Sequence, residues 1–321
     1  MKIRTDFFRT AVLSLLTGLL VAGCASKEAI PPPAPVTAKA APLKQVTAPV
    51  NLGPVINSKL GQGEVSFTGD GKTMYFRCQV RPGRAHNDIC VSRLIDTFEE
   101  GRWTAPEIVA PGVISLTETG ELEPVISPDG KTLFFMSFNR PGGYGGSDIW
   151  YSENVNGVWQ APKNLGPPFN TPFADHCLFF SADGNEAFWT STRPGGYGGN
   201  DIWTSRKVNG VWQPPVNLGP NVNSPHNDHH SIPSPDGKSL YVTSTRPGGF
   251  GGQDNYVTTR DETGTWGPLV NLGPLVNSDK EDLCPSFTPD FRVFIFESGR
   301  AGSYGSTDIW WVYYDRIKHI R

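Results

Sequence analysis

The stretch Ser127-Pro-Asp-Gly-Lys-Thr-Leu-Phe-Phe-Met-Ser-Phe-Asn-Arg-Pro-Gly-Gly-Tyr-Gly-Gly-Ser-Asp-Ile-Trp, residues 127–150, decides the fold because the chain contains five related copies of it. The turn aspartates of these copies are separated by 59, 54, 53 and 54 residues: Asp70, Asp129, Asp183, Asp236 and Asp290. Self-similarity at a period of this length indicates a solenoid or a propeller.

Each copy contains the signals of four short strands. In the second copy these are residues 123–127, 132–137, 148–152 and 158–160, separated by a Pro-Asp-Gly turn, a glycine loop and an Asn-Gly turn. Short segments rich in Val, Phe, Trp and Tyr between such turns are typical of strands. Residues 50–316 show no helical periodicity, and a four-stranded sheet in each repeat predicts one propeller blade per copy.

The two ends of the repeat region complement each other. The fifth copy stops after its third strand, residues 309–314, whereas residues 46–53 line up with residues 159–166 of the second copy. The N-terminal segment can therefore supply the missing outer strand. We predict an all-β fold, a five-bladed propeller of four-stranded blades that is closed by an N-terminal strand completing the last blade.

The segment before the repeats has the layout of a secretory signal, with a basic start, an apolar run over residues 11–22 and a small-residue ending. Its ending, Val21-Ala-Gly-Cys24, resembles the lipobox of bacterial lipoproteins, which implies cleavage before Cys24 and acylation of that cysteine. We expect a signal peptide over 1–23, a lipidated Pro/Ala-rich tether over 24–43, the propeller over 44–316 and a C-terminal tail over 317–321.

The repeat also resembles a known family. The Ser127-Pro-Asp-Gly-Lys turn, the aromatic strand after it and the Arg140-Pro-Gly-Gly loop resemble the PD40, or WD40-like, β-propeller repeat of TolB and of many bacterial envelope lipoproteins. The resemblance covers residues 46–316. It implies the fold but says little about function, because this repeat serves several activities. TolB itself has six blades and a separate N-terminal domain, neither of which is found in this sequence.

Location and charge limit the partners. Cys24 is followed by Ala25 and Ser26, at the place where an inner-membrane retention signal carries Asp. The lipobox resemblance therefore implies the outer membrane, with the propeller facing the periplasm or the cell surface. The chain has 28 basic and 31 acidic residues, a net charge of −3. Nucleic-acid binding requires a basic field, so we expect an envelope protein or glycan as partner, and a monomeric propeller.

Two sets of repeated side chains occupy the glycine loops. The arginines either brace their loops through ion pairs or carbonyl contacts, or collect an anionic ligand; the aromatic residues either pack on a neighbouring loop or form platforms for sugars. The arginines are Arg81, Arg140, Arg193, Arg246 and Arg300, each seven or eight residues before a repeated aspartate, and the aromatic residues are Tyr144, Tyr197, Phe250 and Tyr304. The first blade departs from this pattern, with Arg84 and His86 in its loop, and we expect a partner to contact this irregular loop.

The innermost strands carry residues that break the repeat. Six residues before each turn aspartate stand Glu64, Glu123, Cys177, His230 and Cys284, and two residues earlier Gln62, Glu121, Asp175, Asp228 and Asp282. If Cys177, His230 and Cys284 converge on the channel, they are soft donors for zinc or another transition metal. If the protein is a glycosidase, its acid and base come from Glu64, Glu121, Glu123, Asp175 and Asp228.

Two further cysteines lie on one predicted hairpin. Cys78 and Cys90 are placed symmetrically about residue 84, so a cross-strand disulfide is expected in an oxidising compartment.

Taken together, the sequence favours an envelope lipoprotein with a non-catalytic propeller that binds a protein or glycan and needs no cofactor. A carbohydrate-active enzyme and a metal-binding propeller remain as alternatives.

Overall fold

The computed structural model describes residues 46–79 and 86–320. The predicted signal peptide, the Cys24 lipidation site, the tether, Arg81 and Arg84 lie outside the described residues. Within the described part of the chain, no helix has the length and apolarity needed to cross a membrane. The description below concerns the compact unit that begins at residue 41.

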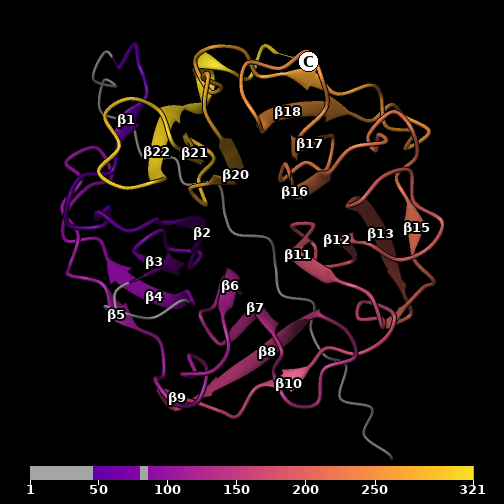
Figure 1. Ribbon diagram of the computed structural model, residues 1–321, viewed down its shortest axis with the longest axis horizontal. Coiled ribbons are helices and arrows are strands. Elements are labelled where there is room, and N and C mark those ends of the chain that lie inside the picture. Colours follow the sequence, from indigo (N-terminus) through magenta and orange to yellow (C-terminus); the bar gives the residue numbers. More distant parts are fainter. Residues whose placement is uncertain (1–45, 80–85, 321) are drawn as a thin grey trace, which may run out of the picture. The chain divides into compact units, whose positions relative to one another are not determined.

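The repeat region forms five antiparallel sheets arranged as a five-bladed β-propeller, as the sequence predicted (Figure 1). Blade 1 contains β2 (Gly63–Phe67), β3 (Thr73–Cys78), β4 (Asp88–Arg93) and β5 (Glu107–Ile108). Blade 2 contains β6 (Glu121–Ile126), β7 (Thr132–Phe138), β8 (Ser147–Val155), β9 (Val158–Trp159) and β10 (Lys163–Asn164). Blade 3 contains β11 (Asp175–Phe180), β12 (Glu186–Ser191), β13 (Asp201–Val208), β14 (Val211–Trp212) and β15 (Val216–Asn217).

The last two blades complete the ring. Blade 4 contains β16 (Asp228–Pro233), β17 (Ser239–Ser244), β18 (Asp254–Thr259) and β19 (Val270–Asn271). Blade 5 contains β20 (Asp282–Phe287), β21 (Val293–Ser298) and β22 (Asp308–Tyr313), followed by the short 3₁₀ helix η1 (Tyr314–Arg316). Its fourth strand is β1 (Val50–Asn51), which pairs with β22.

The pairing of β1 with β22 confirms the predicted closure. The two strands run antiparallel, with Val50 opposite Trp311, and the Leu52 amide donates to the Ile309 carbonyl at 3.0 Å. Asn57 reinforces the junction, because its side chain both accepts from the Ile309 amide and donates to the Ile309 carbonyl. The same clamp is repeated by the buried Asn170 in blade 2.

The outer strand of a blade differs from the prediction. The Gly-x-Trp segment at 158–160 was expected to be this strand, but β8 pairs with two short strands, first β9 and then β10. In blades 4 and 5 the outer strand is the pair of residues that ends in the asparagine of the Asn-Leu-Gly phrase. That asparagine turns the chain, because its Oδ1 accepts the amide of the glycine two residues on, as Asn164 does with Gly166.

Apolar side chains fill the spaces between neighbouring blades. One cluster contains Leu52 from the N-terminal segment with Trp311 from β22 and Phe76 from β3, so it joins blade 5 to blade 1. The predicted C-terminal tail belongs to another cluster, in which Ile317 is 1% exposed beside Tyr241. Residue 317 is therefore part of the propeller core, since burial of its side chain removes apolar surface from water.

The repeated arginines brace the loops. In blade 3, Arg193 contacts Asp175 at 2.8 Å and also donates to the Pro168 and Phe169 carbonyls of the preceding connection. The equivalent pairs are Arg140–Glu121, Arg246–Asp228 and Arg300–Asp282. Asp175, Asp228 and Glu121 are 0% exposed, so these carboxylates and the four arginines are committed to the architecture rather than open to a ligand.

The acid partner of each arginine is not the aspartate that follows the glycine loop. That aspartate holds the loop backbone instead: Asp148 Oδ2 accepts the Tyr144 amide at 2.6 Å, and Asp201 does the same for Tyr197. The sequence pointed to the aspartate seven or eight residues after each arginine, whereas the partner in the structure stands 18 or 19 residues before it, because the chain path brings the start of the inner strand to the loop.

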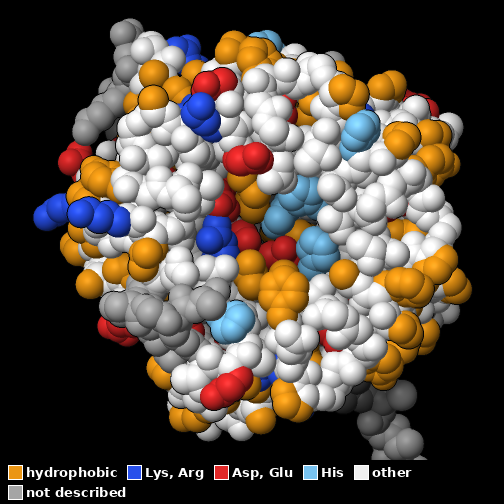
Figure 2. All heavy atoms as spheres, in the orientation of Figure 1, with side chains coloured by type: hydrophobic (Ala, Val, Ile, Leu, Met, Phe, Trp, Pro, Cys, Tyr) orange, Lys and Arg blue, Asp and Glu red, His pale blue; other side chains and the backbone are white. Residues whose placement is uncertain are grey.

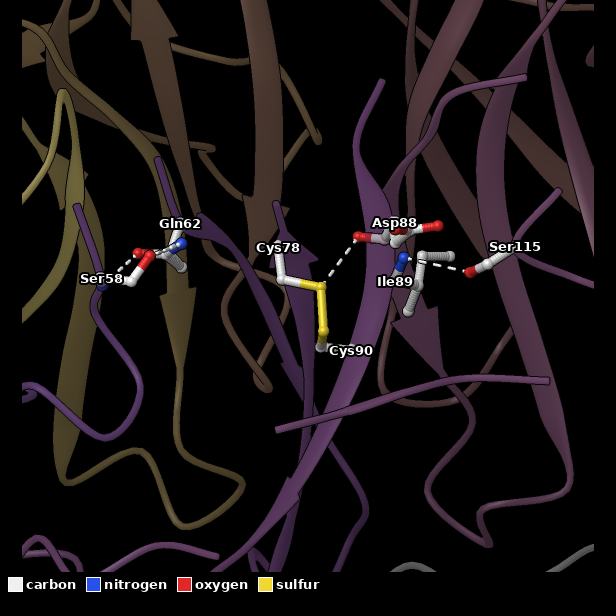
Figure 3. Close-up of a disulfide and its surroundings, with 7 residues drawn as sticks. All are labelled: Ser58, Gln62, Cys78, Asp88, Ile89, Cys90 and Ser115. Atoms are coloured by element: carbon white, nitrogen blue, oxygen red, sulfur yellow. Dashed lines mark hydrogen bonds between the residues drawn. A yellow bond between two sulfur atoms is a disulfide. The ribbon is translucent and has the colours of Figure 1, made fainter. Parts of the chain in front are cut away.

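The disulfide joins Cys78 on β3 to Cys90 on β4, with the two Cα atoms 5.8 Å apart (Figure 3). Both side chains are fully buried. Their symmetry about residue 84 had suggested that the two cysteines face each other directly. They do not. Cys78 faces Asp88 and Cys90 faces Phe76, so the bond crosses the hairpin diagonally.

The ion pair in blade 3 provides a test of the bracing role. Asp175→Asn leaves the buried Arg193 guanidinium without its counter-charge, and we expect the free energy of unfolding to fall by about 3 kcal/mol. Glu153→Gln, which removes an exposed ion pair with Lys163, is the control and should cost less than about 1 kcal/mol. Urea unfolding of the two variants measures both effects. Equal losses would contradict a bracing role for the buried pair.

Reduction of the disulfide tests its contribution to stability. The bond links residues 12 apart in sequence, and restricting a loop of this size in the unfolded chain is worth about 3 kcal/mol. We expect a Cys78→Ala/Cys90→Ala double variant to unfold at a lower temperature than the wild type and to lose any response to a reducing agent. An unchanged midpoint in a scanning calorimeter would show that the bond adds no stability.

Candidate functional site

Two regions of the ring present side chains that the architecture does not use. One is the face that carries the glycine loops and the connections between blades. The other is the channel at the centre of the ring, where Figure 2 shows histidine, acidic and basic side chains gathered around a hollow. These regions contain the remaining predicted site residues.

The loop face presents a half-exposed aromatic side chain from each of four blades. Their exposed fractions are 49–52%, for Tyr144, Tyr197, Phe250 and Tyr304. The aspartate contacts described above hold the backbone of these loops. The glycine directly after each aromatic residue packs tightly on the connection to the next blade. A Cβ at Gly145 would lie 2.1 Å from the Phe173 carbonyl oxygen, and a Cβ at Gly251 would lie 1.9 Å from the Lys280 carbonyl oxygen. The aromatic rings therefore project from rigid loops.

A variable residue packs against the glycine that follows each aromatic residue. The carbonyls that contact the loop glycines belong to Phe173, His226, Lys280 and Leu60, all of which are exposed. His86 in the irregular loop of blade 1 is also exposed. The loop face thus combines a constant aromatic with a neighbour that changes from blade to blade.

The channel is lined by residues of one repeated position. Each inner strand has a register break, and the residue within it has a positive φ of 47–56°, in the left-handed region that non-glycine residues seldom adopt. These bulge residues are Glu64, Glu123, Cys177, His230 and Cys284. Bulges re-aim a side chain, and here all five come together.

The bulge residues contact one another across blades. Glu64 accepts the Glu123 amide at 2.7 Å, and Glu123 accepts the Cys177 amide at 2.5 Å. The Cys177 thiol donates to Glu123 Oε1 at 2.9 Å, and His230 Nε2 lies 3.4 Å from the same oxygen. Glu64, Glu123, His230 and Cys284 line a cavity of about 10 Å³, which is close to the space that one water molecule needs.

The cysteines of the predicted metal set fall into different groups of donors. Cys177 lies with His229 and His230, or with Glu123 and His176, and Cys284 lies with Glu64 and His230; within each group the candidate ligand atoms are within 4.8 Å of one another. His230 belongs both to a group with Cys177 and to the group with Cys284. The predicted residues therefore converge, but not as one three-residue site.

Neighbouring positions add charged groups that the sequence reasoning overlooked. Arg77 from β3 contacts Glu64 at 3.1 Å and also pairs with Glu297 from β21. The equivalent residues in blades 2 to 4 are Met136, Thr190 and Thr243. Comparing this second-strand position across the copies would have revealed both charges. Gly63 leaves room for them, because a Cβ there would lie 1.7 Å from the Glu297 carboxylate.

Burial and charge set the protonation of the cluster. Burial raises the pKa of Glu64 to about 7, against the opposing effect of Arg77. Burial acts in the same direction on Glu123, but His176 and His230 hold the pKa of that carboxyl well below its usual value. Burial, His230 and His176 lower the pKa of His229 to about 3, and burial together with Glu123 raises the pKa of the Cys177 thiol. His229 is thus a neutral imidazole near neutral pH.

The comparisons with known proteins identify the fold. No family model and no curated protein matches this chain. An α-L-arabinofuranosidase from Podospora anserina, solved with cellotriose, is 14% identical with a TM-score of 0.51, covering 83% of this chain and 96% of its own. A GH43 endo-arabinanase from Bacillus licheniformis is 14% identical with a TM-score of 0.50, covering 80% and 95%. A putative TolB from Agrobacterium tumefaciens is 17% identical with a TM-score of 0.47, covering 81% and 84%. At these identities the likeness concerns the propeller fold alone.

Proposed function

We propose that this chain is a lipid-anchored envelope protein whose propeller binds a macromolecular partner, a protein or a glycan, through its loop face. The observation that carries the proposal is the set of four half-exposed aromatic side chains held at equivalent places on rigid loops. Aromatic side chains held in a fixed position bind with little loss of conformational entropy.

The variable neighbours support a specific partner. Gly145, which follows Tyr144, packs on the carbonyl of the apolar Phe173, whereas Gly251, which follows Phe250, packs on the carbonyl of the charged Lys280. A constant aromatic supplies contact area, and a different neighbour in each blade distinguishes one direction around the ring from another. The resemblance of residues 21–24 to a lipobox, with Cys24 as the lipidation site, supports a partner in the cell envelope.

Glycoside hydrolysis is supported less well than binding. Among the candidate carboxylates, Glu121, Asp175 and Asp228 are fully buried and already paired with arginines. Glu64 and Glu123 line a cavity of about 10 Å³, far smaller than the several hundred Å³, about 300 or more, that ligand pockets provide. The similarity to the arabinofuranosidase and the endo-arabinanase concerns the fold alone.

Replacing two loop aromatics tests the proposal. We expect Tyr197→Ser/Phe250→Ser to weaken partner binding by about tenfold or more, because aromatic anchors carry much of the binding energy at such surfaces. Val158→Ser/Val211→Ser is the matched control, since both valines are 63% exposed. They are the first residues of β9 and β14, in the hairpins that these strands form with β8 and β13, away from the glycine loops.

Photo-crosslinking of the full chain in its own envelope provides the measurement. A crosslinker placed at residue 197 should capture a partner protein, or the chain should co-sediment with purified peptidoglycan, and a crosslinker at residue 211 should capture neither. Capture that is equal at both positions, or a wild type that neither crosslinks nor co-sediments, would overturn the proposal.

A further inference from the structure

One histidine of the channel is oriented as a metal ligand. His229 Nε2 lies 2.7 Å from Gln253 Oε1. The amide oxygen can only accept, so Nε2 carries the hydrogen and Nδ1 keeps its lone pair. Metal-ligating histidines usually donate their other nitrogen to a protein oxygen in this way. His229 is 9% exposed, and its Nδ1 lies 2.5 Å from His230 Nδ1, so that without a metal this lone pair accepts a hydrogen bond from His230.

A thiol and a second imidazole meet this nitrogen. Cys177 comes from β11 of blade 3, whereas His229 and His230 come from β16 of blade 4, and their candidate ligand atoms lie within 4.8 Å of one another. Cys177 is 1% exposed and His230 is 7% exposed. His230 Nε2 makes no hydrogen bond among the described residues, although Glu123 Oε1 lies 3.4 Å from it. Burying such an atom is costly unless something binds it.

A carboxylate lies beside two of these donors. Glu123 Oε1 lies 2.9 Å from Cys177 Sγ and 3.4 Å from His230 Nε2. His176 contacts the same oxygen at 3.1 Å, as an outer partner that orients a metal-bound carboxylate would. One sulfur, two imidazole nitrogens and one carboxylate oxygen form the kind of four-donor set that zinc accepts in tetrahedral geometry.

We propose that the channel binds one thiophilic transition-metal ion, with Zn²⁺ as the best fit, through Cys177, His229, His230 and Glu123. Binding forms a metal–sulfur bond and releases the thiol proton to solvent. The ion would connect blades 2, 3 and 4, from which the four ligands come. This site is separate from the loop face, so it does not depend on the proposed function.

The second buried thiol supplies the matched control. Cys284 lies on the other side of His230, grouped with Glu64. Glu64 is already engaged by the Arg77 guanidinium and by the Glu123 amide. We therefore place Cys284 outside the ligand set, although the sequence had grouped it with Cys177 and His230.

The experiment measures zinc and cobalt binding by the full chain purified without a chelator. We expect about one zinc per chain by mass spectrometry. After zinc is exchanged for Co²⁺, we expect the thiolate-to-cobalt charge-transfer band and the visible bands of a tetrahedral site. Cys177→Ser should remove the charge-transfer band and weaken zinc binding by about 100-fold or more. Cys284→Ser should keep both the band and the affinity.

Thermal unfolding separates loss of metal from loss of fold. Zinc should raise the unfolding midpoint of the wild type and of Cys284→Ser, because a ligand that binds only the folded state stabilises it, and should leave Cys177→Ser unchanged. If Cys177→Ser does not fold, His229→Gln carries the same test. Absence of bound zinc after incubation with Zn²⁺, a cobalt spectrum without the thiolate band, or equal losses in Cys177→Ser and Cys284→Ser would overturn the proposal.

Discussion

The ring depends on the pairing of two residues from the N-terminal segment with β22. This contact gives blade 5 its fourth strand and turns a row of five sheets into a closed ring. The buried cluster at the junction takes side chains from both ends of the chain, Leu52 and Trp311 among them. Once the ring is closed, its five inner strands surround a common centre, so a side chain turned inwards from one blade must meet those from the others.

Each inner strand has the same backbone bulge, and the side chain at the bulge differs from blade to blade. A non-glycine residue in the left-handed region costs about 1 kcal/mol or more, and the chain accepts this cost five times at the bulges. The bulge fixes where a side chain points and leaves its chemistry free. Carboxylate, thiol and imidazole occupy equivalent positions, as in Glu123, Cys177 and His230. Such positions can change function without disturbing the fold.

The sequence predicts the blades and the closure because both follow from repetition, which shows directly which segments are equivalent. It also predicts that Cys177 and His230 converge, because equivalent positions in a ring face the same centre. It does not show that His229 replaces Cys284 beside them, since that depends on the side-chain direction on either side of a bulge. The arginine partner was missed for a similar reason: the sequence pointed to the aspartate soon after each arginine, whereas Arg193 pairs with Asp175, 18 residues before it.

The distribution of charge around the channel shows why a cation suits one side of it. On the side of blades 1 and 5, Arg77 lies between Glu64 and Glu297 and compensates carboxylates within the cluster. On the side of blades 3 and 4, His229 and His230 face each other and His230 Nε2 lacks a hydrogen-bond partner among the described residues. Apolar side chains would fill a purely structural centre at lower cost, because buried polar groups must be fully satisfied to be tolerated. The His230 nitrogen without a hydrogen bond therefore lies on the side where a bound cation would engage it, whereas Arg77 already supplies a positive charge on the other side.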